Sequence, residues 1–292
     1  SCVHYAVLDR SCRVLFSPNP LMHFGDPMGA VSEAWSIVCD RFGRREVIST
    51  AFTGCGAKTL ASMAPDIAYV YDSVAIPNGV RIIDPHAGYV FHMGARDAYF
   101  FHIRTIQGRP IIQQWCTGTK CGGGSGLLIE KQCRRLLQGE APVPLIEAPP
   151  VQDQIRTVNR RNLQTRMEWM FEQAREEASR STMPSEFLAR CGVVIQSDLI
   201  HKQNEGASRR DNLAGLFLAV ARNYKVDVLG ARDFHDSQTR AVATGGVMAL
   251  DLVHTHLSRL LGIEIHRPRE FHNMAAIGAA AKALEEQNRF VF

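Results

Sequence analysis

The chain has 292 residues, of which 46% are hydrophobic and 21% are charged, a composition typical of soluble globular proteins. Its length exceeds that of one compact unit, so we expect two associated subdomains. The net charge of +4 is small, and no basic stripe is interleaved with aromatic residues, which argues against nucleic acid as a partner. No stretch approaches the roughly 18–20 apolar residues of a membrane helix, and the N-terminus lacks the features of a signal peptide. We therefore expect neither membrane contact nor export.

The eight cysteines favour metal or redox chemistry over disulfides, because the chain is long and carries no export signal. Plain burial is the alternative for each of them. We assign Cys2, Cys12 and Cys39 to that alternative or to chemical inertness.

The first third of the chain predicts a hairpin, a helix and a strand. Alternating Val3, Tyr5 and Val7 indicate a hairpin over 2–17. Apolar residues at helical spacing predict a helix over 29–42 that ends at Gly43. Residues 46–50 predict a strand that leads into a glycine loop.

The middle of the chain predicts a meander followed by helices. Residues 87–116 have the pattern of three antiparallel strands, and the glycine-rich residues 121–126 then open a helix. The Pro-rich residues 139–152 predict a loop, and 153–180 predict a long charged helix with few apolar positions.

The last third predicts two further helix–strand repeats. Residues 208–211 form a capping box before a helix with an apolar stripe. A strand over 242–244 runs into Gly245 and Gly246. A helix over 251–261, a strand over 263–265 and a helix over 273–284 follow.

Strand pairs followed by helix and strand occur twice, which predicts an α/β protein with two related halves and a cleft between them. We place the first half at 1–86 and the second at 87–292, with an insertion at 139–180. The first half begins on what would be its second strand. We therefore expect that its leading strand is missing before Ser1.

Three ordered segments resemble the ATP-dependent activators of 2-hydroxyacyl-CoA dehydratases and the related ATPase subunits of benzoyl-CoA reductases. The first, residues 120–130, is similar to the family's K-C-A-A-G-T-G-x-F-L-E. The second, 190–200 with the helix start at 206–215, looks like C-x-V-F-A-E-S-E-V-I. The third is the turn at 244–247, with 276–280 near the end of the chain.

The resemblance implies an actin-like fold of RNase H-like halves, as in Hsp70 and sugar kinases. It also implies a [4Fe–4S] cluster on the two-fold axis of a homodimer, held by Cys121 and Cys191 of each subunit. A cubane needs four thiolates, and a symmetric pair of chains supplies them. The alternatives are buried thiols, or a zinc half-site made by Cys116 and Cys121. Cys116 and Cys133 have no family counterpart and are interpreted as neighbours.

The resemblance also implies an ATP/ADP and Mg²⁺ site. Residues 92–97 align with the family's D-I-G-G-Q-D, which assigns Gly94, Ala95 and Arg96 to the nucleotide and makes Asp97 the catalytic acid. His92 replaces the first acid of that motif, and Arg96 replaces its glutamine. The loss of that acid argues against hydrolysis, because an acid there normally positions Mg²⁺ or water. Arg96 either contributes positive charge to phosphate binding or is a surface turn residue.

Two further glycine segments are assigned to the same nucleotide. Gly123 and Gly124 belong to the first motif, and the adenosine-side turn is formed by Gly245, Gly246 and Val247. The turn at 245–247 has a plainer alternative, a simple strand-to-helix connection. No D-x-G-[ST] phosphate loop precedes Cys2, and we interpret its absence as trimming of the chain.

The family implies an anaerobic, cytoplasmic electron-transfer ATPase. Its electron donor is ferredoxin or flavodoxin, and its partner is a 2-hydroxyacyl-CoA dehydratase or a benzoyl-CoA reductase. The insertion at 139–180 is either a solvated helix or a docking element for a partner. Two other functions remain open: a nucleotide-binding regulatory subunit that does not hydrolyse ATP, and a kinase-type phosphotransferase.

Overall fold

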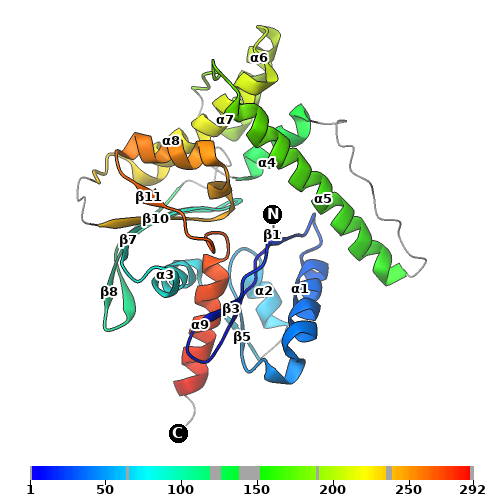
Figure 1. Cartoon of the computed structure of the whole chain (residues 1–292), viewed down its shortest axis with the longest axis vertical. Helices are drawn as coiled ribbons and strands as arrows, with labels where there is room; N and C mark the ends of the chain where they lie inside the picture. The colour runs from blue at the N-terminus through cyan, green and yellow to red at the C-terminus, as the bar shows by residue number, and fades with distance from the viewer. Residues whose placement is uncertain are drawn as a thin grey trace. The chain divides into compact units, whose positions relative to one another are not determined.

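The computed structural model describes residues 2–63, 66–118, 126–137, 152–188, 191–234 and 239–289 (Figure 1). The chain divides into two compact units. Unit 1 consists of residues 1–90, 101–114 and 268–292, and unit 2 consists of 91–100 and 115–267. Among the described residues, no helix is both long enough and apolar enough to cross a bilayer.

Among its described residues, unit 1 contains three short strand pairs and four α-helices. Its strands are β1 (Cys2–Val3), β2 (Val7–Leu8), β3 (Val14–Phe16), β4 (Leu21–Met22), β5 (Thr50–Phe52) and β6 (Ile67–Tyr69). β1 pairs with β4 and β2 with β3, both antiparallel, whereas β5 and β6 are parallel. Its helices are α1 (Pro27–Phe42), α2 (Ala57–Ser62), α3 (Asp72–Ile83) and α9 (Met274–Arg289).

The helices α3 and α9 pack against each other backbone to backbone (Figure 1). A Cβ on Gly278 would lie 1.8 Å from the carbonyl oxygen of Ala75, and one on Gly79 would lie 1.9 Å from that of Met274. Any side chain at either glycine would therefore force the helices apart. The contact also explains why α3 is helical although Pro77 lies inside it.

A five-stranded sheet has the order β11-β10-β7-β8-β9. Its strands are β7 (Ala87–Met93), β8 (Ala98–Ile106), β9 (Arg109–Thr117), β10 (Arg240–Thr244) and β11 (Ile265–His266), with β10 and β11 parallel. The expected meander is confirmed as three consecutive neighbouring strands, β7, β8 and β9.

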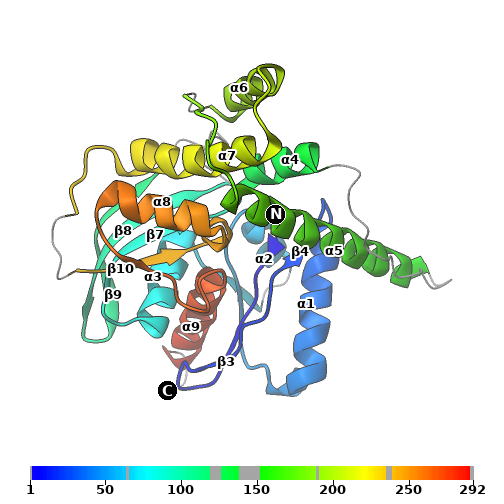
Figure 2. The same cartoon turned by 45° about the horizontal axis from the view of Figure 1, so that its top comes forward.

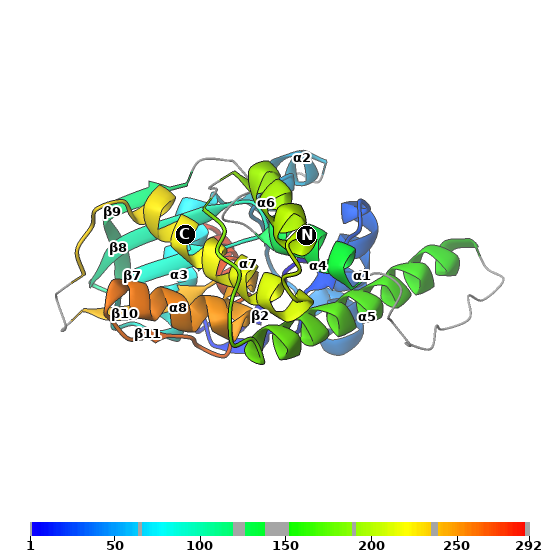
Figure 3. The same cartoon turned by 90° about the horizontal axis from the view of Figure 1, so that it is seen from above.

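The helices of unit 2 are α4 (Gly126–Leu136), α5 (Gln152–Ser179), α6 (Gly192–Asn204), α7 (Arg209–Tyr224) and α8 (Asp251–Leu261). Figure 2 shows α7 and α8 side by side, and Figure 3 shows α5 beside α7. The core includes the rings of Phe91, Phe100 and Phe234, whose centroids are 5.4 Å apart in each pair. The buried Tyr224 hydroxyl donates to the carbonyl oxygen of Tyr99 at 2.6 Å.

The positions predicted for two strands are wrong. Residues 44–46 form a short 3-10 helix after Gly43, whose φ is +84°, so the strand predicted at 46–50 starts at Thr50 instead. The Ile263 amide donates to the Ser258 carbonyl at the end of α8, so the strand predicted at 263–265 begins only at Ile265. The helices predicted at 29–42, 153–180 and 251–261 are confirmed as α1, α5 and α8.

Candidate functional site

The turn between β7 and β8 requires glycine at its first position. The Gly94 amide donates to the carbonyl oxygen of Asp97 at 2.9 Å. A Cβ on Gly94 would lie 2.9 Å from that oxygen and 3.3 Å from Nε2 of His92. The Asp97 side chain is half-buried and that of Arg96 is exposed, so the turn presents both charges close to an accessible backbone.

A side-chain hydrogen bond joins the ends of β7 and β10. Nδ1 of His92 lies 2.8 Å from Oγ1 of Thr244, which is fully buried. The imidazole occupies the position at which the family motif has a carboxylate. One of its ring nitrogens contacts Thr244 on the neighbouring strand β10. Asp97 is left as the carboxylate of this turn.

The backbone of the β10 turn touches the end of β7. Gly245 has a φ of +90°, and a Cβ there would lie 2.2 Å from the carbonyl oxygen of Met93. Its neighbour Gly246 begins a short 3-10 helix (Gly246–Ala249), and a Cβ added there would have no neighbouring atom within 4 Å. Glycine is required at 245 by this close approach, whereas 246 is open.

The N-terminus of α4 is docked onto the same turn. The amides of Gly126 and Leu127 donate to the carbonyl oxygens of Gly94 and Ala95 at 3.1 and 3.0 Å. The first amides of a helix have no partner within the helix, so the turn satisfies two of those of α4. A Cβ on Gly126 would lie 3.1 Å from Cγ2 of Val247.

Three segments far apart in the sequence therefore meet at one place: the 94–97 turn, the start of α4 and the 244–247 turn. Glycine backbones at strand ends allow a phosphate group to approach closely. Thr244 and Gly126 hold the arrangement together, although sequence reasoning gave neither a site role. Both residues lie inside the motifs, but their role in holding the turns together is visible only in the long-range contacts.

Of the two predicted cluster ligands, only Cys191 lies among the described residues. It is the half-buried N-cap residue of α6, and its carbonyl oxygen accepts from the Ile195 amide at 2.9 Å. A helix N-terminus favours a thiolate over a thiol. Cys121 lies outside the described residues, as do Gly123 and Gly124.

The two cysteines interpreted as neighbours differ from Cys191 in their surroundings. Cys133 is fully buried in α4, and burial raises the pKa of its thiol to about 12, so it is a thiol at neutral pH. Cys116 lies half-buried on β9. In the part of the chain that the structure describes, no three His, Cys, Asp or Glu side chains gather as a metal site would require.

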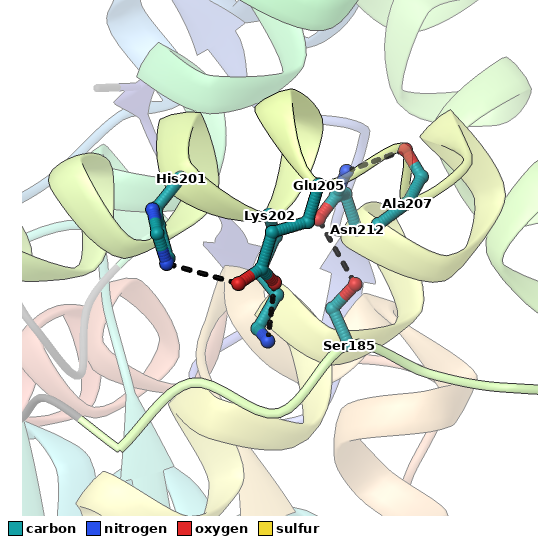
Figure 4. Close-up of polar contacts among 6 residues, drawn as sticks. All are labelled: Ser185, His201, Lys202, Glu205, Ala207 and Asn212. Atoms are coloured by element: carbon teal, nitrogen blue, oxygen red, sulfur yellow. Dashed lines mark hydrogen bonds and ion pairs between the residues drawn. The ribbon is translucent and has the colours of Figure 1, made fainter.

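The corner between α6 and α7 is fixed by polar contacts (Figure 4). Glu205 accepts from Lys202 at 2.8 Å and pairs with His201 at 3.0 Å. The buried Asn212 accepts from the Ser185 hydroxyl at 3.0 Å and donates to the Ala207 carbonyl at 3.3 Å. The first two contacts lie within the last turn of α6 and its C-cap, and the other two tie Ser185 and Ala207 to α7.

No protein-family profile and no curated protein matches the chain. Two of the solved structures that match do so over almost their whole length. Component A of (R)-2-hydroxyglutaryl-CoA dehydratase from Acidaminococcus fermentans has a TM-score of 0.74 at 18% identity, covering 99% of this chain and 98% of that chain. The activator of 2-hydroxyisocaproyl-CoA dehydratase from Clostridium difficile, solved with bound ADPNP, has a TM-score of 0.71 at 16% identity, covering 99% and 96%.

Both neighbours belong to the activator family that the three motifs resemble. At such low identity the match establishes the fold. The prediction of an actin-like α/β protein is confirmed, and the chain has the fold of the 2-hydroxyacyl-CoA dehydratase activators.

Proposed function

We propose that the chain is an ATP-dependent reductive activase, which passes a low-potential electron to an acyl-CoA dehydratase or reductase. The observation that carries the proposal is the meeting of the 94–97 turn, the start of α4 and the 244–247 turn at the ends of β7 and β10, through His92, Thr244 and Gly245. The fold shared with two dehydratase activators supports it. The partner would be a 2-hydroxyacyl-CoA dehydratase or an enzyme similar to benzoyl-CoA reductase.

The nucleotide would bind where these turns meet. Gly94, Ala95 and Arg96 would line the phosphates, and the 245–247 turn would lie against the adenosine. Asp97 would orient Mg²⁺ or water, because His92 replaces the other acid of the motif and contacts Thr244 instead. The C. difficile activator was solved with ADPNP, an ATP analogue, which supports a nucleotide in this fold. We keep the division into halves at 1–86 and 87–292, with the cleft between them, as part of the proposal.

Cys121 and Cys191 would hold a [4Fe–4S] cluster together with the same residues of a second subunit. Such a cluster supplies one-electron chemistry at low potential. The position of Cys191 fits this role, because the N-terminal amides of α6 stabilise a thiolate. The donor would be ferredoxin or flavodoxin in an anaerobic cytoplasm.

The contact between the start of α4 and the 94–97 turn would couple nucleotide binding to the position of Cys121. Gly126, five residues after Cys121, donates to the carbonyl of Gly94 in the proposed phosphate turn. A nucleotide that favours one position of this turn would therefore also favour one position of the segment that carries Cys121. A ligand shifts such an equilibrium only by its difference in affinity for the two states.

The nucleotide half of the proposal is tested with Asp97→Asn, using binding of a fluorescent ATP analogue and phosphate release by the anaerobic holoprotein. We expect nucleotide affinity within about threefold of wild type and turnover lowered at least tenfold, since general acid–base groups contribute about 10²–10⁴. Asp40→Asn, the same change at an exposed residue of α1, is the control and should spare turnover. Equal turnover in wild type and Asp97→Asn would remove Asp97 from the mechanism.

His92 favours one second candidate, a nucleotide-binding regulatory subunit without hydrolysis. The imidazole replaces a family acid and is committed to a structural contact with Thr244. Tight nucleotide binding without phosphate release in the wild-type holoprotein would favour this candidate over the activase.

A further inference from the structure

Unit 1 contains a cavity of about 550 Å³ that none of the motifs involves. Its polar wall includes Ser11, Arg81 and Glu270, and its apolar wall includes Val14, Ile82 and Pro85. The volume falls within the range of small-molecule sites, which combine apolar walls with a few polar groups.

One wall of this cavity is a rigid turn between β2 and β3. Oδ1 of Asp9 accepts from the amides of Ser11 and Arg13 at 2.8 and 2.9 Å, and Oδ2 accepts from Nε of Arg13 at 2.7 Å. These bonds hold Cys12 at a φ of +61°, which is uncommon for a residue other than glycine. The guanidinium of Arg13 is thereby committed to Asp9.

Arg81 is differently placed, in the last turn of α3. Its Nε is buried without a hydrogen-bond partner, and in the described part of the chain Arg81 makes no ion pair. Burial raises the pKa of the Cys12 thiol, and this outweighs the opposite effect of the Arg81 charge. Cys12 is therefore a neutral thiol at neutral pH and does not pair with Arg81 as a thiolate. Arg81 therefore brings to the cavity a half-buried positive charge that no described acid pairs.

Glu270 brings the opposite charge to the same cavity. It is half-buried, and among the described residues its carboxylate forms no ion pair with Arg81 or with another base. Two opposite charges that line one cavity without pairing are complementary to a ligand that carries both signs.

We propose that this cavity binds a small zwitterion of the α-amino acid class. Arg81 receives the carboxylate and Glu270 the ammonium group, while Val14, Ile82 and Pro85 contact an apolar side chain. The site is independent of the proposed activase function.

The test is calorimetric titration of the full chain with L-valine. Isovalerate, which keeps only the carboxylate, and isobutylamine, which keeps only the ammonium group, are matched ligands. We expect valine to bind at least tenfold more tightly than either. Arg81→Gln and Glu270→Gln should each weaken valine binding at least tenfold, and only Arg81→Gln should weaken isovalerate.

Arg13→Gln is the matched variant, because this side chain also lines the cavity but is 80% exposed and paired with Asp9. It should change valine affinity less than threefold. If Arg81 had a structural role instead of binding the ligand, Arg81→Gln would melt at a lower temperature than the wild type in the absence of ligand. That result, no valine binding up to about 10 mM, or equal binding of valine and isovalerate would each overturn the proposal.

Discussion

Replacing Gly245 by alanine perturbs the candidate site at its tightest point. The residue has φ +90° and ψ 154°, a region that only glycine enters readily. Its new Cβ would also lie 2.2 Å from the carbonyl oxygen and 2.6 Å from the carbonyl carbon of Met93. The turn would have to change its dihedral angles and move away from β7.

The size of the effect follows from these two costs. A residue forced into such a backbone conformation costs about 1–3 kcal/mol, and inserting a methyl group into packed structure costs about 1–3 kcal/mol more. We therefore expect Gly245→Ala to lower the free energy of unfolding by about 2–6 kcal/mol. With roughly 2–4 °C lost per kcal/mol in large domains, the melting temperature should fall by at least about 4 °C.

Gly246→Ala is the control, because it adds the same methyl group one residue later in open space. It should leave stability unchanged or raise it by about 0.4–1 kcal/mol through the unfolded chain. Thermal melting by circular dichroism and titration with a fluorescent ATP analogue measure both variants. The reasoning is refuted if the two variants melt within about 1 °C of each other.

Two further predictions concern unit 1. Gly278→Ala should lower stability by at least about 2 kcal/mol in urea unfolding, since its Cβ would lie 1.8 Å from the Ala75 carbonyl oxygen, whereas the same change in an unobstructed helix gains about 1 kcal/mol. Burial and the nearby His272 lower the pKa of His4 to about 4, below its usual 6.5. The unfolded chain then binds the proton first, so stability is complete above pH 6.5 and is lost as the pH falls from 6.5 towards 4, by up to about 2 kcal/mol at pH 5. His4→Gln should flatten this dependence in urea midpoints measured at pH 7.5 and 5.

The control for the pH series is His201→Gln, which removes an exposed histidine from α6. It should keep the acid sensitivity of the wild type. A His4→Gln protein that loses as much stability as the wild type between pH 7.5 and 5 would contradict the assignment. For Gly278, an unchanged urea midpoint would mean that the helices adjust without cost.

Sequence signals near the ends of a helix predicted those helices whose ends are set by neighbouring residues. The helix α8 ends at Gly262, which adopts the left-handed conformation with φ +66°, and α7 begins at Ser208, whose hydroxyl accepts from the Asp211 amide. The apolar stripe of α7 is buried as its spacing predicts. In each case the signal and the structure lie within a few residues of each other.

Contacts between distant segments explain the rest. No element was predicted for 72–83, which contains Pro77, Asn78 and Gly79, residues typical of turns, yet packing against α9 makes this segment α3. Gly94, Gly245 and Gly246 of the candidate site were predicted from motifs. The His92–Thr244 bond and the docking of α4 on Gly94 were not, because each joins residues more than 30 positions apart.

Iron and acid-labile sulfide analysis of the anaerobically purified chain tests the central claim most directly. One four-iron cluster per dimer predicts about two irons per chain in the wild type and in Cys116→Ser, the control on β9. Cys121→Ser and Cys191→Ser should each retain almost none and should run as monomers in gel filtration. Full iron content in either of these two variants, or an iron-free wild type reconstituted under the same conditions, would contradict the account.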